Sequence, residues 1–480
     1  MIGAAPLGLV AVLAIVAADP AVAADPAVAD DAGPAAGGAA VDSAPCAVPA
    51  SERPPALRCG EALDGRPPAE SSAARQLGRA TLVVPRLVTR VVFWPLVKTT
   101  DVVEHHRVMD WLRAVLTTDD GLVGVRPELQ YSTSFVPSVG ARLFYRRLPG
   151  GPGSELMARF QTAGPAVTLS QVGVSGPEWL GLSLLGTWHR RNDWLFAGNG
   201  PNSKEDLARA GQEPARYAAD LLGAELRWSR RFPGHLVGKA RGGLERRNYS
   251  TNSTQRAPSV AEVFGLPPET CAALGLPQPC VNEAEMPGFH NGVRIVRAGA
   301  GIGIDLRDTM RDGGGFSLML NGDIAQGIAG DPSQFASSSV EMVVGAGIND
   351  HVLLFRGRAG LVGKLGSAPI PFEELFIPTG RDDMRGFPVG RFRGQSGIVG
   401  SAEYRWYLSA YLDATLFADI GTVAGPQFSG LDWSRWFPSV GVGFRYYKPQ
   451  GPYWQAQALN GIQIAYSPEY LRLLFSLASF

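Results

Sequence analysis

A strict two-residue alternation is the feature that most restricts what this chain can fold into. In residues 296–307, apolar side chains occupy every even position, while every odd position holds glycine or a charged residue, Arg297, Asp305 and Arg307 among them. Successive side chains of a β-strand point to opposite faces. Between the layers of a soluble β-sandwich, the polar face would strand two arginines. A membrane β-barrel instead offers lipid outside and a polar lumen inside.

The same alternation recurs further along the chain, for instance at 412–420 and 440–446. Over residues 124–480 it predicts an all-β fold, a transmembrane antiparallel β-barrel of about 16 strands, which is an even number as in other bacterial barrels. Long connections near 191–214, 253–288 and 365–395 all follow odd-numbered strands. They should therefore lie at one end of the barrel, on the outer side of the membrane.

Composition excludes two other classes. Hydrophobic residues reach 45%, but after the first two dozen positions no apolar run approaches the roughly 18 residues of a membrane-spanning helix. A helical membrane protein is therefore excluded. Lys+Arg and Asp+Glu are both 44. The chain therefore lacks the excess of positive charge that a nucleic-acid partner requires.

The N-terminal residues indicate export. Residues 1–23 are predicted to be a signal peptide, because an apolar stretch is followed by Ala21-Val22-Ala23, which has the small-x-small form of a cleavage site. No Lys or Arg precedes the apolar stretch, which departs from the usual signal peptide. Residues 24–78 are rich in Ala, Pro, Gly and Asp and are predicted to form a disordered periplasmic tether.

Residues 79–123 are predicted to form a periplasmic amphipathic helical segment, with the helix at 97–116. There, apolar residues recur at helical spacing with charges between them. This helix either recruits a separate periplasmic partner or plugs the inner mouth of the barrel. His105 and His106 are adjacent and face different directions on a helix, so no metal site is expected.

The four cysteines suit an oxidising compartment. Cys271 and Cys280 close a short loop without nearby histidine or clustered carboxylates, and we predict that they form a disulfide. The pairing of Cys46 and Cys59 stays open.

Several motifs in the second half of the chain resemble the BamA/TamA-like surface-antigen family of outer-membrane barrels. Arg385-Gly386-Phe387 is similar to the family's Arg-Gly-aromatic signature in the sixth outer loop, and Phe417-x-Asp419-x-Gly421 is similar to its partner motif on the following strands. Residues 196–203 also resemble the third outer loop. The resemblance spans most of 124–480 and implies a loop lock inside the barrel formed by Arg385, Gly386, Phe387, Glu403, Asp419 and Gly421.

The physical chemistry of these residues agrees with that lock. An arginine inside a lumen loses hydration and is tolerated only where carboxylates meet its planar fork. Glu403 and Asp419 take the inward phase of adjacent predicted strands, so we expect both to pair with Arg385. Gly386 would allow a tight turn, and Phe387 would wedge the loop in place.

The resemblance implies a multi-pass protein of the cell outer membrane, in contact with outer-membrane lipid, that inserts or translocates client outer-membrane or secreted proteins. Family members usually carry periplasmic POTRA modules. Residues 24–123 are too short and too disordered in composition for one such module plus the connecting helix, so the chain resembles a reduced branch without POTRA domains. The alternative is a passive pore or structural barrel without clients. No nucleophile elbow or phosphate-binding loop is found in the sequence, so we expect neither enzymatic activity nor a cofactor nor a metal.

Overall fold

The computed structural model describes residues 98, 111 and 114–478, with gaps at 147, 149–150, 152, 178, 253–256, 308–313, 349–350, 381, 410–411 and 449–456. The predicted signal peptide and tether, together with Cys46, Cys59 and Phe480, lie outside the described residues. Of the predicted 97–116 helix, Lys98, Trp111 and residues 114–116 are described, and they are helical. Among the described residues, no helix has the length and apolar character to cross a membrane.

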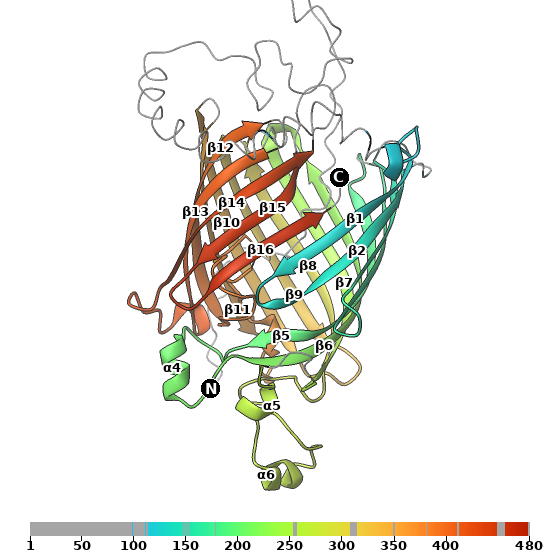
Figure 1. Cartoon of the computed structure of the whole chain (residues 1–480). Helices are drawn as coiled ribbons and strands as arrows, with labels where there is room; N and C mark the ends of the chain where they lie inside the picture. Colours follow the sequence, from blue (N-terminus) through green and yellow to red (C-terminus); the bar gives the residue numbers. More distant parts are fainter. Residues whose placement is uncertain are drawn as a thin grey trace, which may run out of the picture.

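Sixteen antiparallel strands form a closed barrel in which each strand pairs with its sequence neighbours and β1 pairs with β16 (Figure 1). This confirms the predicted fold class and strand number. The strands are β1 Val123–Ser132, β2 Phe135–Tyr145, β3 Glu155–Thr162, β4 Val167–Ser175, β5 Leu182–Phe196, β6 Ala215–Arg231, β7 Leu236–Ser250, β8 Val293–Asp305, β9 Gly315–Gly327, β10 Gln334–Ile348, β11 His351–Lys364, β12 Ser396–Ser409, β13 Leu412–Ala424, β14 Phe437–Lys448, β15 Gln457–Tyr466 and β16 Leu471–Ala478.

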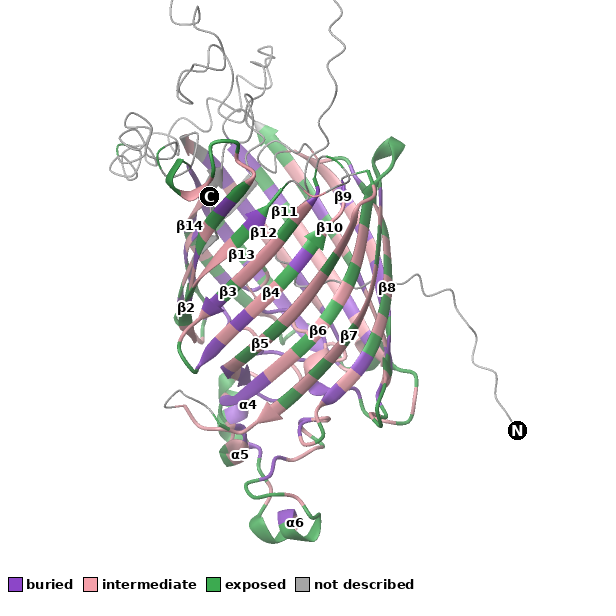
Figure 2. Cartoon of the chain, turned by 90° about the vertical axis from the view of Figure 1, so that its right-hand side faces the viewer, coloured by how far each residue is buried: buried purple, intermediate pink, exposed green. Residues whose placement is uncertain are grey.

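The alternation in the sequence sets which side chains face outward. On β7 and β8, Leu244 and Ile302 are 55% and 60% exposed, whereas Arg247 and Arg297 point inward and are largely covered. On the side of the barrel that Figure 2 shows, exposed and less exposed residues alternate along the strands. The outward rows are therefore mainly apolar, and most of the paired charges lie in the lumen, as a membrane-spanning barrel requires.

The long connections gather at one end of the barrel, which we call the loop end (Figure 1). It carries 197–214 with α4 (Lys204–Arg209), 251–292 with α5 (Val260–Val263) and α6 (Pro268–Ala273), and 365–395 with the 3-10 turn η5 (Phe372–Glu374). The turn η6 (Pro426–Phe428) lies in the β13–β14 connection, and η3 (Pro233–His235) lies in the β6–β7 turn at the opposite end. Cys271 and Cys280 form a disulfide within the 251–292 loop.

Candidate functional site

The connection between β11 and β12, residues 365–395, folds back into the lumen and contacts opposite walls of the barrel. Its side chains Phe372, Met384, Phe387 and Phe392 are fully buried. The two largest sets of ion pairs that hold it there are centred on Arg385 and on Glu373 and Glu374. Two single pairs, Asp383 with Arg358 and Arg391 with Glu469, hold it as well.

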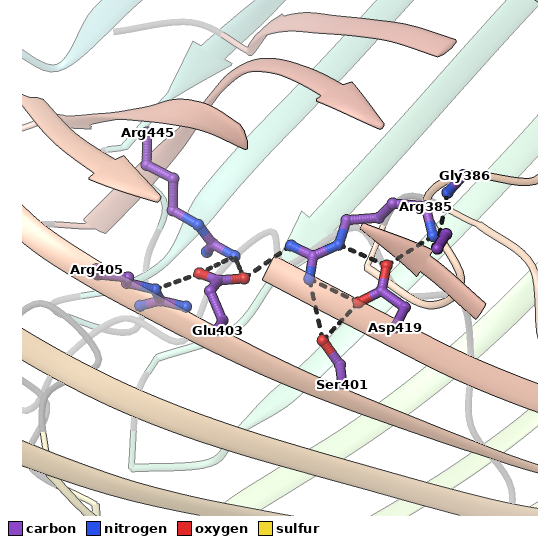
Figure 3. A network of polar contacts seen from close by, with 8 residues as sticks. Arg385, Gly386, Ser401, Glu403, Arg405, Asp419 and Arg445 are labelled. Carbon is purple, nitrogen blue, oxygen red and sulfur yellow. Dashed lines mark hydrogen bonds and ion pairs between the residues drawn. The ribbon is translucent and has the colours of Figure 1, made fainter. Parts of the chain in front are cut away.

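Arg385 lies at the tip of this loop and faces carboxylates from two adjacent strands (Figure 3). Its Nε and Nη2 donate to the two oxygens of Asp419 on β13 at 3.0 and 2.7 Å, and its Nη1 donates to Glu403 on β12 at 2.7 Å. The backbone N–H of Arg385 also donates to Asp419, at 2.9 Å, and Nη2 donates to the Ser401 hydroxyl at 3.0 Å. The planar fork of the guanidinium is thus filled by oxygen acceptors.

The Arg385 side chain is only 1% exposed and lies over the Phe417 ring, with its Cζ 3.5 Å from the ring centroid. Burial lowers the pKa of Arg385, but hydrogen bonds and charges from Asp419 and Glu403 raise it more, so the pKa lies above its ordinary value. The arginine therefore stays charged in a buried site. A cation over an aromatic face gains further stabilisation where water is excluded.

Glu403 is shared among three arginines. Besides Arg385 it accepts from Arg405 on its own strand and from Arg445 on β14, the latter at 2.9 Å (Figure 3). Asp419 is held differently, since its other partner is the Ser401 hydroxyl, at 2.7 Å. Loss of Arg385 would thus leave Glu403 with two cations and Asp419 with a neutral donor.

The two glycines of the predicted lock allow the 365–395 loop to lie close against the barrel wall. A Cβ on Gly386 would lie 2.4 Å from the Cβ of Ser439, and a Cβ on Gly421 would lie 2.6 Å from the sulfur of Met384. Phe387, which is fully buried, packs edge-on against Phe392 and Tyr470. The structure thus brings all six predicted lock residues to one place.

We expect Gly386→Ala to displace the loop, because the added methyl would lie on the wall of β14. A backbone shift of this kind costs about 1–3 kcal/mol. Gly380→Ala, in the same loop, is the matched control, since a Cβ there meets nothing within 4 Å. Limited proteolysis of residues 382–395 compares the two variants, and equal cleavage would contradict the close approach.

Sequence reasoning missed the second set of contacts, which we call the Glu373–Glu374 anchor. Arg297 donates to Glu374 at 2.6 Å, and Arg247 lies 3.1 Å from both glutamates. The Tyr217 hydroxyl also donates to Glu373, at 2.5 Å. The sequence did carry one indication of this anchor. Arg297 lies on the inward face of β8, and an inward-facing arginine needs a carboxylate partner.

Burial raises the pKa of Glu374, but Arg297 and Arg247 lower it more, so its pKa lies below the ordinary value. The neighbouring Phe372 packs against Phe196, Tyr217 and Tyr249. The anchor therefore combines charge pairing with an aromatic core on the β5–β7 wall.

Two further arginines, also missed, hold the return of the loop. Arg391 pairs with Glu469 of the β15–β16 connection at 2.7 Å and donates to the Asn202 carbonyl at 2.8 Å. Arg393 donates to the Leu195 carbonyl at the end of β5 at 2.9 Å. These acceptors are far away in sequence, and most are backbone carbonyls. No pattern of residue types therefore predicts these contacts.

The site offers charge pairing and packing. Among the residues that the structure describes, no group of three or more His, Cys, Asp or Glu side chains is arranged to hold a metal ion. The arrangement can hold a loop in one position and can release it if the pairs break.

Comparison with known proteins identifies the family. The model of the Omp85 superfamily domain matches residues 169–460, and no curated protein matches. Among solved structures, BamA from Haemophilus ducreyi lacking POTRA domains 1–3 aligns with a TM-score of 0.49 and 14% identity, over 75% of this chain and 70% of that one.

Two CdiB structures align less well. CdiB from Acinetobacter baumannii has a TM-score of 0.42 and 12% identity, over 74% of this chain and 60% of its own, and CdiB from Escherichia coli has a TM-score of 0.44 and 12% identity, over 74% and 63%. The chain thus spans less than two thirds of either CdiB. The family model, which covers more than half of the chain, confirms the resemblance: the protein belongs to the Omp85 superfamily.

Proposed function

We propose that this barrel resides in the outer membrane, with its loop end at the cell surface, and inserts or translocates client proteins, with the 365–395 loop clamped inside in the competent state. Membership of the Omp85 superfamily, whose barrels are outer-membrane proteins, supports the location and the class of activity. The role is mechanical and non-enzymatic. Clients are outer-membrane or secreted proteins.

The observation that carries the proposal is the position of Arg472 on the last strand. This side chain is 2% exposed, and its Nη1 donates to the backbone carbonyls of Arg385, at 2.8 Å, and Phe387. Its Nη2 donates to the Ser132 hydroxyl on the first strand at 2.8 Å. One buried guanidinium thus joins the clamped loop to both strands of the barrel seam.

Among the described strands, the β1–β16 junction is one of the two shortest, since β15 and β16 also pair over five residues. Strand β1 pairs with β16 over Glu128–Ser132, five residues, whereas β1 and β2 pair from Val123 to Ser132. If the loop withdrew, Arg472 would lose two of these three acceptors in a buried site, where unpaired charge costs several kcal/mol. Loop position and seam pairing are therefore coupled, which serves a barrel that opens for clients and has no purpose in a passive pore.

The test is depletion of the protein followed by quantitative proteomics of the outer membrane and the medium. We expect one or more outer-membrane or secreted proteins to disappear, and restored expression of the parent chain to bring them back. No missing client would overturn the proposal. The matched control is re-expression of Arg209→Ala, which changes only an exposed arginine on α4 and should also restore the clients.

Planar-bilayer conductance distinguishes the proposed function from the alternative, a passive pore. The clamped loop crosses the lumen, so we expect the intact barrel to stay mostly closed. A steady, large conductance of the parent protein would favour the passive pore.

A further inference from the structure

The outward face of the barrel carries an unusual group of charges near the loop end. Arg190 on β5, Arg246 on β7 and Arg294 on β8 all take the outward phase, beside the apolar positions Trp188, Leu244 and Val296. Arg190 and Arg246 are exposed, and Arg294 is half-buried. Charged side chains on the apolar side of a membrane barrel are costly except near the interfaces, so this group needs a reason.

The arrangement is unfavourable for the protein alone. Arg246 and Arg294 lie directly opposite each other across the β7–β8 pair, and like charges in that position repel. Among the described residues, no carboxylate lies within ion-pair distance of Arg190, Arg246 or Arg294. The guanidinium of Arg294 is 3.5 Å from the Ala329 carbonyl, a weak contact.

Two aspartates lie close by but are committed to other donors. Asp220 on β6, opposite Arg190, accepts from the Trp188 indole N–H at 3.0 Å. Asp331 accepts from the backbone N–H groups of Arg294, at 2.6 Å, and Ser333, at 2.8 Å. The three arginines therefore keep most of their donors free for an anion from outside.

Below the arginines the wall is apolar. Leu222, Leu244 and Val296 are 56%, 55% and 37% exposed and continue the same outward rows toward the middle of the barrel. A molecule that fits both parts has a phosphate head and acyl chains. Guanidinium groups bind phosphate through paired hydrogen bonds, and acyl chains cover exposed leucine and valine.

We propose that Arg190, Arg246 and Arg294 form a binding site for the phosphate groups of an acylated glycolipid in the outer leaflet. This inference rests on the proposed position of the loop end at the cell surface. The lipid would sit against β5–β8, with a phosphate between the opposed Arg246 and Arg294. Its negative charge would turn their repulsion into a shared contact.

The test uses the purified, folded full chain in a neutral detergent with diphosphoryl lipid A as the probe. We expect the probe to bind, to be retained in native mass spectrometry, and to raise the melting midpoint of the barrel. Lipid A stripped of both phosphates should bind at least about tenfold more weakly, because the charged hydrogen bonds between phosphate and the arginines are lost.

The variant Arg246→Gln/Arg294→Gln should lose at least about tenfold in affinity, while melting without lipid at the parent's midpoint or above it, because the opposed charges are gone. The matched control is Arg230→Gln, an outward arginine at the other end of β6, which should bind like the parent. Parent-like affinity in the double variant, or equal binding of the stripped lipid, would overturn the proposal. So would displacement of the probe by inorganic phosphate at equal concentration.

Binding is measured on the isolated barrel and requires no client. A negative depletion experiment would therefore leave the lipid result intact. A negative lipid result would equally leave a client phenotype intact.

Discussion

Replacement of Arg385 by alanine is expected to release the tip of the 365–395 loop from the wall formed by β12 and β13. The change removes the four hydrogen bonds that the Arg385 side chain donates to Asp419, Glu403 and Ser401, and it leaves Asp419 buried without a cation. Breaking a buried ion pair from one side costs about 3–5 kcal/mol. Limited proteolysis in lipid should show new cleavage between residues 382 and 395 while the barrel still migrates as a folded, heat-modifiable band.

Asp419→Asn should release the same segment, since Asp419 accepts from both the side chain and the backbone of Arg385. Arg209→Ala provides the control. Its side chain is 77% exposed and pairs with Asp206 on the surface, so its loss should change stability by less than about 1 kcal/mol. If Arg385→Ala protects residues 382–395 as well as the control does, the buried clamp does not hold the loop.

The combined variant Glu373→Gln/Glu374→Gln is expected to have an effect of similar size on the opposite wall. It removes two negative charges that face Arg247 and Arg297 in the lumen. Glu245 still pairs with Arg247, but among the described residues Arg297 loses the one carboxylate with which it forms an ion pair. The expected cost is about 3 kcal/mol or more, measured as a lower melting midpoint and cleavage near residues 366–380.

The contacts of Arg385 and the Glu373–Glu374 anchor hold different parts of the loop, so each variant should free its own part. Arg385→Ala should expose 382–395 before 366–380, and the glutamine variant should do the reverse. Glu205→Gln, an exposed acidic position on α4, is the control for loss of negative charge. Identical cleavage patterns in both variants would mean that the loop detaches as one unit and that the two sets of contacts are not separate.

Much of the fold was predictable because one physical rule applies along the whole wall. Residues 296–307 alternate as strand β8 does, with Arg297 inward and Ile302 outward. The same phase argument placed Glu403 and Asp419 on the inward face, within reach of a loop arginine. In these strands the sequence period and the structural period are the same.

The rest depends on partners that no period identifies. Glu373 and Glu374 lie in an aperiodic loop, so their contact with Arg247 depends on how the loop crosses the lumen. Arg472 binds two backbone carbonyls and Ser132, which lies 340 positions earlier in the chain. Every residue has a backbone carbonyl that can accept a hydrogen bond, so the sequence alone cannot predict which carbonyls Arg472 binds.

Hydrogen–deuterium exchange of the parent protein in lipid nanodiscs tests the central claim most directly, because it needs no substitution. The backbone N–H groups of Arg385, Phe387 and Gly394 donate to Asp419, the Met384 carbonyl and the Phe376 carbonyl inside the barrel. Peptides covering 382–395 should therefore exchange as slowly as strand peptides, and far more slowly than the exposed connection at 429–435. Exchange of 382–395 at the rate of 429–435 would contradict a loop clamped in the lumen.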